Sequence, residues 1–526
     1  MSGELALAVL GLVEGSIKLV RKIKSTCQSY READEGVKER FVLLESLWIK
    51  VEMQLEFLAK ISSHLTDDLV QSQLNLLQRL KGRLAQAASQ LEAVDPRSIE
   101  NKGKAADVLR KWKFALVKSS LDELMGELEA WQQRFDPSWY LMILISGKVL
   151  DNALVESADS DLAQSDLDSN PLNKMLAIRS TLNPGLKPQS KTHVNLSHDG
   201  LKGAQESAIS FSAARTVVRA GSTNLLVVER VSCPSGMTSQ MKIDVGNLAK
   251  KLQNVDPTTF GLLRCKGILK HHDALNKLSA IDVVYTTPLN CQQPQTLRHH
   301  LSQQKPVSLS MIMRIAKQLV RSVHYVHTCG FVHKNIRPEN ILIFPGSNNG
   351  SLGESFLIGF TEFRNANFQT NLYGDAAWHR NIYRHPQRQG PFVLDRYVMQ
   401  HDIYSIGVCL LEIALWRSFV WYPAPDGSAT PVPSMGLGFA CDDKDFETTQ
   451  LTSKRRIKEQ LVRLAEEELP PRVGDTYMSI VVDCMKCLDP DSEKFGDIKG
   501  LADEDGIVVG VKYVEHILGR IMEISV

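Results

Sequence analysis

The chain is poor in cysteine. It has 9 cysteines in 526 residues, an odd and scattered set that does not suit a disulfide framework. Cys484 and Cys487 form a lone CxxC pair, whereas a structural zinc ion needs about four ligands. The pattern predicts reduced thiols in a cytoplasmic protein, with this pair on one face of a helix.

Long apolar runs are also scarce. The N-terminal run Leu5–Val13 has nine residues, while a membrane-spanning helix needs about 20. Glu4 precedes the run and basic residues follow it, which is the reverse of the charge order in a secretory signal. We therefore expect neither a secretion signal nor a stable membrane span.

An excess of charge of either sign is missing too. Lys and Arg number 61 against 60 for Asp and Glu, so the formal net charge is +1. Such a chain has no global electrostatic reason to bind nucleic acid, and we expect no nucleic-acid partner. Hydrophobic residues make up 43%, close to the average of soluble globular proteins, which excludes a wholly disordered or multi-span chain.

Proline is almost absent from residues 1–150, where only Pro96 and Pro137 occur. Leucine and valine recur there at steps of three and four, the spacing of amphipathic helices. The breaks predict four helices over about 4–31, 37–62, 67–94 and 105–134, and an extra helix over 137–150. Short loops between long helices favour an all-α, up-and-down bundle over residues 1–150.

Basic and large apolar residues are scarce in the next segment, 151–207. From Asp151 to Asp168 there are six acidic residues and no Lys or Arg. A segment with so little to bury does not offset its ordering entropy, so we expect a flexible linker. A loosely packed helix around Lys174–Thr181 is the alternative.

From about residue 208 the pattern is mixed. Residues 224–231 and 279–285 read as strands, and residues 308–327 and 400–416 read as long helices. Short strands followed by long helices predict a two-lobed α+β domain over 208–526. We place its first lobe at about 208–288 and its second at about 289–526.

One stretch identifies a family. Residues 331–342 read FVHKNIRPENIL, which resembles the protein-kinase catalytic loop H-R-D-L-K-P-E-N after a long helix. The positions that match this loop are His333, Lys334, Arg337 and Asn340. Asp402, in HDIYSIGVCLLEI, is similar to the kinase aspartate that braces the loop. The resemblance implies a two-lobed protein-kinase-like fold, in which Gln387 and Arg472 hold the places of a late Glu–Arg pair.

The departures from the family pattern concern catalysis. Asn335 stands where kinases have the aspartate that accepts the substrate proton, and an amide cannot take that proton. Gly359 stands where the resemblance places the magnesium-binding aspartate, and it offers no side-chain oxygen to a hard cation. The resemblance therefore implies a degraded site, a pseudokinase.

The nucleotide-binding end is altered as well. No G-x-G-x-x-G precedes the first strand, and the strand lysine falls at Glu229 or Arg230. A glutamate there would repel phosphate, whereas Arg230, with Asn340, would allow weak nucleotide contact. The next helix, 242–253, has no glutamate to pair with either residue. We expect binding of ATP and Mg²⁺ to be weakened.

The first 150 residues also show a resemblance. The opening LALAVLGLV and the later segment QQRFDPSW, residues 132–139, look like the fungal HeLo-type domain, whose family includes the HET-S prion-inhibition proteins. That family acts on membranes through its first helix. The two-part layout is similar to that of the mixed-lineage-kinase-like necroptosis executioners. Candidate membrane-contact residues are Leu5, Leu7, Val9, Leu10, Leu12, Val13, Lys18, Arg21, Lys22 and Lys24.

These patterns support one main hypothesis and two alternatives. The main hypothesis is a cytoplasmic cell-death or signalling effector, recruited to anionic lipids, in which the pseudokinase receives an upstream protein and restrains the bundle. The first alternative is a divergent active protein kinase that uses Asn340 and a relocated metal ligand such as Glu362. The second is a scaffold that forms homo-oligomers without a membrane. An apolar helix and a basic cluster can equally be core and solvated face.

Overall fold

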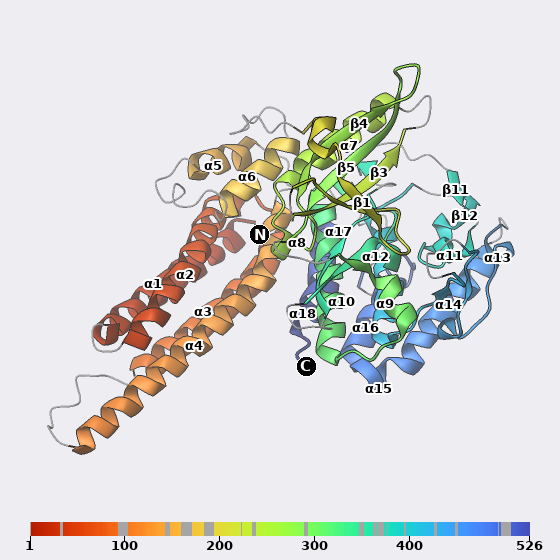
Figure 1. The fold of residues 1–526 in the computed structure, drawn as a ribbon. Helices are drawn as coiled ribbons and strands as arrows, with labels where there is room; N and C mark the ends of the chain where they lie inside the picture. Colours follow the sequence, from red (N-terminus) through yellow and green to blue (C-terminus); the bar gives the residue numbers. More distant parts are fainter. Residues whose placement is uncertain are drawn as a thin grey trace. The chain divides into compact units, whose positions relative to one another are not determined.

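The computed structural model describes residues 2–31, 35–92, 104–142, 148–158, 171–182, 194–221, 224–233, 238–288, 293–346, 352–360, 364–365, 373–375, 377–393, 396–424, 429–447, 451–492, 494–495 and 507–526. The chain forms two compact units, Met1–Arg179 and Ser180–Val526 (Figure 1). The first unit is helical and the second combines a sheet-containing lobe with a helical lobe, which confirms the predicted fold class.

Four long helices build the first unit. They are α1 (Ser2–Arg31), α2 (Glu35–Ile61), α3 (Asp67–Glu92) and α4 (Lys104–Leu141). Helix α1 packs against α2 and α3, and α4 packs against the same two helices, which closes the bundle. Buried leucines and valines at steps of three and four line the interior, as the sequence pattern predicts.

The prediction of a separate helix over 137–150 is wrong. Residues 137–141 continue α4, with Pro137 inside the helix, and α5 (Lys148–Ala158) begins later. The aromatic residues on both sides of the proline are fully buried. Phe135 stacks on Trp139 with ring centroids 6.1 Å apart, and Trp139 meets Phe57 edge-on at 5.3 Å. This burial offsets the helix-breaking tendency of proline.

A flexible linker from residue 151 is also contradicted. Residues to Ala158 belong to α5, and α6 (Pro171–Leu182) confirms the alternative helix near 174–181. Asp151 and Arg179 join the two helices by a buried ion pair of 2.8 Å. Leu154 in α5 and Leu172, Met175 and Ile178 in α6 are buried, so the packing of a few apolar side chains outweighs the overall polarity. Residues 159–170 and 183–193 of the predicted linker lie outside the described part of the chain.

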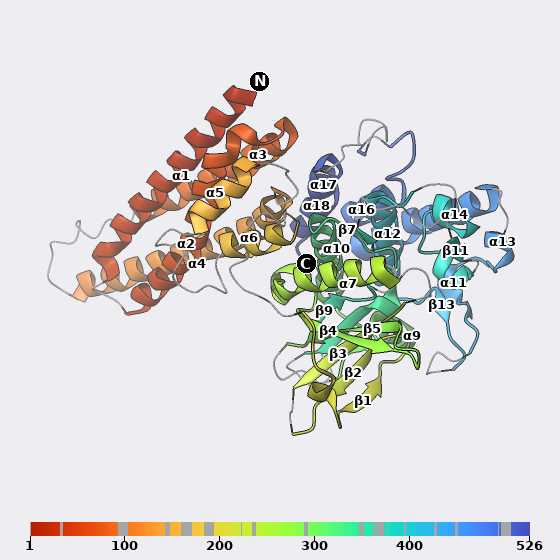
Figure 2. The same ribbon diagram turned by 90° about the horizontal axis from the view of Figure 1, so that it is seen from above.

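The sheet-containing lobe of the second unit is one antiparallel sheet with the strand order β1-β2-β3-β5-β4. Its strands are β1 (Gln205–Ala208), β2 (Arg215–Val218), β3 (Leu225–Ser232), β4 (Cys265–His272) and β5 (Leu278–Thr286). Helix α7 (Thr238–Gln253) packs across β4 and β5 (Figure 2). The predicted strands at 224–231 and 279–285 are β3 and β5.

The second lobe is mainly helical. Its longest members are α10 (Leu309–Thr328), α12 (Met399–Leu415), α14 (Leu451–Glu468) and α16 (Asp475–Met485). Every residue of α12 is buried, as its nearly uniform apolarity predicts. The short helix α8 (Pro257–Phe260) lies between α7 and β4, so it belongs to the first lobe. The other helices of the second lobe are α9 (Leu297–Gln303), α11 (Trp378–Asn381), α13 (Lys444–Glu447), α15 (Pro470–Val473), α17 (Ile507–Tyr513) and α18 (Gly519–Glu523). Its strands are β6 (Gln295–Thr296), β7 (Phe331–Val332), β8 (Ile341–Pro345), β9 (Leu352–Leu357), β10 (Arg364–Asn365), β11 (Tyr373–Asp375), β12 (Gly390–Phe392), β13 (Val420–Trp421) and β14 (Val432–Pro433).

Three absences apply to the described residues. None of their helices combines the length and the apolarity that crossing a bilayer requires. Their cysteines are free and buried, including Cys484 in α16 and Cys487 just after it. They hold no cluster of His, Cys, Asp and Glu suited to a metal ion.

Candidate functional site

The segment 333–340 between β7 and β8 is held in place by Asp402. This aspartate lies in the first turn of α12, and its carboxylate accepts hydrogen bonds from the backbone N–H of His333 at 2.7 Å and of Lys334 at 2.9 Å. Tyr397 and His327 donate to the same carboxylate. Burial alone would raise the pKa of Asp402, but these donors lower it. The contact implied by the kinase resemblance is thus present.

His333 links this loop to the end of β9. Burial lowers the pKa of His333 to about 4, so its imidazole is neutral at pH 7. Its Nε2 donates to the carbonyl of Ile358 at 3.0 Å, and its Nδ1 accepts from the N–H of Asn335. The next residue, Lys334, has a φ of +68°, a left-handed conformation that the two bonds to Asp402 hold in place.

Asn335 occupies the position of the proton-accepting aspartate. Its amide nitrogen donates to the carbonyl of Gly359 at 3.4 Å, and its amide oxygen accepts from the Nε of Arg337 at 3.0 Å. Both ends of the side chain therefore have partners within the protein. A neutral amide in this arrangement orients its neighbours but offers no base.

The Asn340 side chain occupies the space next to the Cα of Gly359, where any other residue would place its Cβ. The side-chain nitrogen of Asn340 donates to the carbonyl of Asn335 at 2.6 Å. A Cβ on Gly359 would lie 2.3 Å from the Asn340 Cγ, and the φ of Gly359 is +92°. An aspartate at position 359 therefore has no room without a rearrangement. Together with the neutral Asn335, this donor set does not fit a magnesium ion. Glu362, the relocated ligand of the active-kinase alternative, lies outside the described residues.

Glu229 on β3 points into the space between the two lobes. Its carboxylate accepts from the N–H of Gly359 at 2.6 Å and from the hydroxyl of Tyr285 at 3.0 Å. Burial raises the pKa of Glu229 to about 7, although these hydrogen bonds oppose the rise. Glu229 therefore ties the sheet to the Gly359 segment.

Arg230 points to the opposite face of the sheet, as its neighbour position on a strand requires. Its guanidinium makes two hydrogen bonds to Asp282 on β5, at 2.7 and 2.8 Å. Asp282 also accepts from Arg215, and its pKa is lowered to about 2 because these arginines outweigh burial. The expected weak nucleotide contact through Arg230 is therefore wrong.

The loop between β1 and β2, residues 209–214, contains no glycine and contacts the second lobe. The carbonyl of Ser210 accepts from the hydroxyl of Thr296, at the start of α9, at 3.0 Å. Phe211 packs on Tyr422 with ring centroids 5.2 Å apart. The loop therefore rests on the second lobe through both backbone and side chain.

Helix α7 is anchored by a lysine rather than by a glutamate. Lys251 is buried, donates to the carbonyl of Cys329 at 2.5 Å and lies 4.1 Å from the centre of the Phe331 ring. Burial lowers the pKa of Lys251 to about 8. The contact connects α7 to the segment that leads into the 333–340 loop. An ion pair between α7 and β3 through a helix glutamate is excluded by the sequence of α7.

Arg298 in α9 was missed by the sequence analysis. Its guanidinium is fully buried, and it donates to Glu339 at 3.1 Å, Glu412 at 2.7 Å and Tyr383 at 2.5 Å. The network fixes the turn at 338–340 to α9 and α12. A hydrophobic stripe does not reveal which arginine is buried, although the glutamate in the P-E-N motif gave a partner to search for.

Gln387 and Arg472 hold the places of the kinase Glu–Arg pair, but Gln387 carries no charge for Arg472 to pair with. Arg472 lies at the surface, 47% exposed, and pairs with Glu468 one helical turn away at 3.3 Å. The backbone N–H of Gln387 donates to the ring of His385. Because position 387 has no carboxylate, no negative charge there would offset the desolvation cost of burying the Arg472 guanidinium.

The membrane-contact candidates on α1 divide between two faces. Val9 and Val13 are buried in the bundle, so membrane contact by these two residues in this conformation is wrong. Leu7 is 68% and Leu10 is 36% exposed, while Leu5 and Leu12 are half-buried. Among the basic residues, Lys18 and Arg21 are exposed. Lys22 pairs with Glu92 and Lys24 with Glu45.

A two-lobed fold with this loop defines a protein-kinase-like domain, and comparison with known proteins agrees. The family model "Protein kinase domain" matches residues 259–424, so this part of the chain carries a protein kinase domain. Mitogen-activated protein kinase p38a of Drosophila melanogaster is 21% identical over 278 residues, 49% of this chain and 69% of that protein. Rabbit serine/threonine-protein kinase 17A is 25% identical over 158 residues, 30% of this chain and 37% of that protein.

The chain matches only small parts of some other relatives. A probable serine/threonine-protein kinase of Dictyostelium discoideum is 29% identical over 122 residues, 23% of this chain and 7% of that protein. Mouse eukaryotic translation initiation factor 2-alpha kinase 1 is 30% identical over 113 residues, 20% of this chain and 18% of that protein.

Proposed function

We propose that the second unit is a pseudokinase that controls the helical first unit, and that the first unit is the output of a signalling or cell-death effector. The observation that carries the first part is the contact of the Glu229 carboxylate with the N–H of Gly359, at 2.6 Å. A carboxyl side chain takes the place of a phosphate-binding lysine and ties down the segment that would hold magnesium. Whether it is ionised or neutral, this carboxyl group gives phosphate no positive charge to bind.

The neighbouring residues support the same proposal. Asn335 offers no base, and Asn340 occupies the space that a side chain at position 359 would need. The side chains of Asn335 and Asn340 donate to the carbonyls of Gly359 and Asn335, so hydrogen bonds within this segment hold the loop in shape. Asp402 and Arg298 hold the loop in shape, whereas Asn335 supplies no base and Gly359 supplies no side-chain ligand for magnesium.

A phosphate-transfer assay tests this part. The full chain is incubated with radiolabelled ATP, Mg²⁺ and a general protein substrate, beside the Asn340→Ala variant. We expect no transfer above background from either protein. Magnesium-dependent transfer that disappears in Asn340→Ala would overturn the pseudokinase and favour the divergent kinase. Circular dichroism of both proteins shows that they are folded.

The proposed output is contact of α1 with anionic lipid, with the protein recruited from the cytoplasm. Leu7 and Leu10 expose apolar surface, and Lys18 and Arg21 expose positive charge on the same helix. Such a segment binds an interface without crossing it, and each basic residue near an anionic leaflet contributes about 1 kcal/mol. The resemblance of residues 1–150 to HeLo-type domains also supports lipid contact through α1. Co-sedimentation of residues 1–182 with anionic vesicles, beside the full chain, tests it.

A further inference from the structure

The core of the first unit contains a glutamine whose amide group makes no hydrogen bond. Gln73 lies on the buried face of α3, between Val70 and Leu77, and is fully buried. Among the residues that the structure describes, neither its side-chain oxygen nor its side-chain nitrogen has a partner, so exchanging the two atoms changes nothing. Water satisfies an exposed amide, and burial without partners therefore destabilises the closed bundle.

A second glutamine in the same core shows the ordinary arrangement. Gln54 of α2 is also fully buried, but its amide nitrogen donates to Asp136 at 3.1 Å and its amide oxygen accepts from Gln132 at 2.6 Å. Lys50 pairs with the same aspartate at 3.0 Å. Because nearly all buried polar groups in native proteins are paired, the exception at Gln73 calls for an explanation.

Gln73 is level with the first turns of α1. Lys81 of α3 lies against Gly15 of α1, where a Cβ would be 3.0 Å from the Lys81 Cε, and Lys22 pairs with Glu92 at 2.6 Å. In both contacts a later residue of α1 meets a later residue of α3, so the two helices run parallel. Gln73 precedes Lys81 by about two helical turns, which places it near the start of α1.

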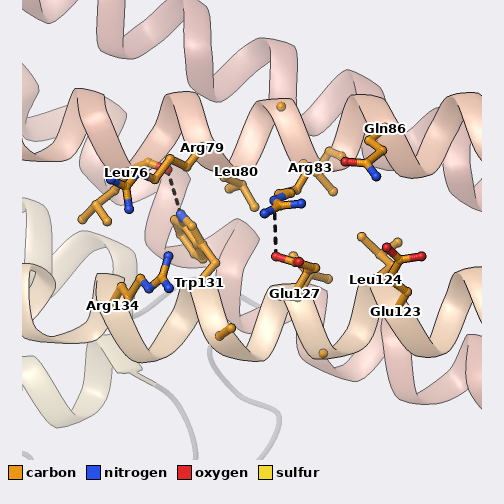
Figure 3. A pocket seen from close by; sticks show the side chains of 15 residues that line it. Leu76, Arg79, Leu80, Arg83, Gln86, Glu123, Leu124, Glu127, Trp131 and Arg134 are labelled. Atoms are coloured by element: carbon orange, nitrogen blue, oxygen red, sulfur yellow. Dashed lines mark hydrogen bonds and ion pairs between the residues drawn. The ribbon is translucent and has the colours of Figure 1, made fainter. Parts of the chain in front are cut away.

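The polar contacts of α3 hold α4 more firmly than the start of α1. Figure 3 shows that Trp131 donates to the carbonyl of Leu76, at 2.9 Å, and that Arg83 pairs with Glu127, at 3.4 Å. These two contacts run in opposite directions along the helices, so α4 is antiparallel to α3. The ion pair between α1 and α3 lies near the other end of α1 and is about half exposed, so it contributes little.

A second unpartnered polar group lies at the same end of the bundle. The Trp139 ring is fully buried, and its Nε1 has no hydrogen-bond partner within the described part of the chain. Trp139 follows Trp131 by about two turns along the antiparallel α4, so it lies near the start of α3. Two buried polar groups without partners are thus gathered at the end of the bundle where α1 begins.

The first turns of α1 have two different faces. Ala6 and Val9 are buried in the bundle, whereas Leu7 and Leu10 are exposed. Release of these turns would let water reach the Gln73 amide, and it would add the two buried side chains to the apolar surface that α1 presents.

We propose that Gln73 is a built-in destabilising group that makes the first turns of α1 easy to release from the bundle. The inference rests on the proposed function, in which α1 contacts anionic lipid, and it concerns the regulation of that contact. The closed bundle buries an amide that only the open form can satisfy with water. An apolar side chain at position 73 would therefore hold α1 in place.

Hydrogen exchange of the full chain, measured by mass spectrometry on peptides that cover residues 5–13, tests the proposal. Gln73→Met keeps the approximate length of the side chain and removes its polar atoms. We expect the backbone amides of residues 5–13 to exchange at least tenfold more slowly in this variant, because the opening that exposes them becomes rarer. The midpoint of thermal unfolding should rise.

Gln54→Met is the matched control, because it makes the same change at a fully buried glutamine that has partners. It removes the bonds to Asp136 and Gln132, so it should lower the midpoint of thermal unfolding and should not slow the exchange of residues 5–13. The two substitutions are thus expected to act in opposite directions.

Two results would overturn the proposal. A lower midpoint in Gln73→Met would show that this amide stabilises the closed bundle, as that of Gln54 does. Unchanged exchange of residues 5–13 would show that the opening of α1 does not expose position 73.

Binding of the full chain to vesicles of phosphatidylcholine and phosphatidylserine separates this inference from the proposed function. Where the wild type binds, Gln73→Met should bind at least threefold more weakly, and equal binding would contradict control by Gln73. A wild type that binds no vesicles would contradict the proposed lipid contact, while the exchange rates, which involve no lipid, would still decide the role of Gln73.

Discussion

At the scale of single residues, the central question is which of the two neighbours Glu229 and Arg230 places its side chain between the two lobes. The sequence alone left the strand-lysine position open between them. Strand geometry sends adjacent side chains to opposite faces, and the hydrogen bonds of Arg230 to Asp282 show which face it takes. Glu229 is consequently the residue in the cleft, where its carboxylate meets the N–H of Gly359.

Glu229→Gln should remove a pH-dependent component of stability. A carboxyl group with a raised pKa in the folded chain adds stability below its ordinary value of 4.5, and this contribution is lost as the pH rises through about 7. At roughly 1.4 kcal/mol per pH unit, the wild type should lose about 2–3 kcal/mol relative to Glu229→Gln between pH 5 and 8. Urea unfolding of both proteins across this range measures the difference.

The comparison with the variant is essential, because buried histidines titrate in the opposite direction. Burial lowers the pKa of His333 to about 4, so its contribution grows as the pH rises. That contribution is common to both proteins and cancels. Parallel stability curves for the wild type and Glu229→Gln would show that Glu229 does not titrate near neutral pH.

At the scale of elements, periodicity predicted the long helices and the two central strands well. Helices 4–31, 37–62, 67–94 and 105–134 correspond to α1 to α4, and the strands to β3 and β5. The predicted helix boundary at Pro137 and the predicted linker after residue 151 are both wrong for the same reason. In both places, packing of a few apolar side chains outweighs the local signal, and contacts distant in sequence do not appear in a pattern.

The candidate site was likewise predictable only in part from the sequence. The catalytic-loop motif located Asp402 and its bond to His333, because both lie in recognisable segments. The Arg298 network was missed, since the choice of a buried partner depends on tertiary contacts.

Arg298→Met should destabilise the second unit strongly. The substitution leaves the carboxylates of Glu339 and Glu412 buried without their shared cation, a loss of about 3–5 kcal/mol. Arg472→Met is the matched control, because it removes an exposed pair worth at most about 1 kcal/mol. Chemical unfolding followed by fluorescence measures both. Equal effects would mean that Arg298 does not join α9 to α12.

Substitutions on the two faces of α1 should separate stability from lipid binding. Leu7→Asp and Leu10→Asp lie on the exposed face, so we expect nearly unchanged unfolding and loss of most vesicle binding. Val9→Asp buries a charge in the bundle and should unfold the first unit. Vesicle co-sedimentation and thermal unfolding give the two readouts. Wild-type binding by Leu7→Asp/Leu10→Asp would exclude this face as the lipid contact.

At the scale of the whole molecule, the proposed control requires that the second unit restrains the first. The unit boundary matters for any test, because α5 and α6 belong to the helical unit. A fragment that ends at residue 150 would lose the buried pair of Asp151 and Arg179 together with the helices it joins. Residues 1–182 are therefore the fragment that keeps the first unit intact.

Dye leakage from anionic liposomes tests whether the second unit restrains the activity of the first unit or has no effect on it. We expect residues 1–182 to release dye at least tenfold faster than the full chain, because removal of the second unit lifts the restraint on α1. Leu10→Asp in the fragment should abolish the release, which ties it to the exposed face of that helix. Equal leakage from fragment and full chain would contradict restraint. A folded fragment, judged by circular dichroism, that neither binds nor permeabilises vesicles would exclude lipid contact as the output and favour the scaffold that works without a membrane.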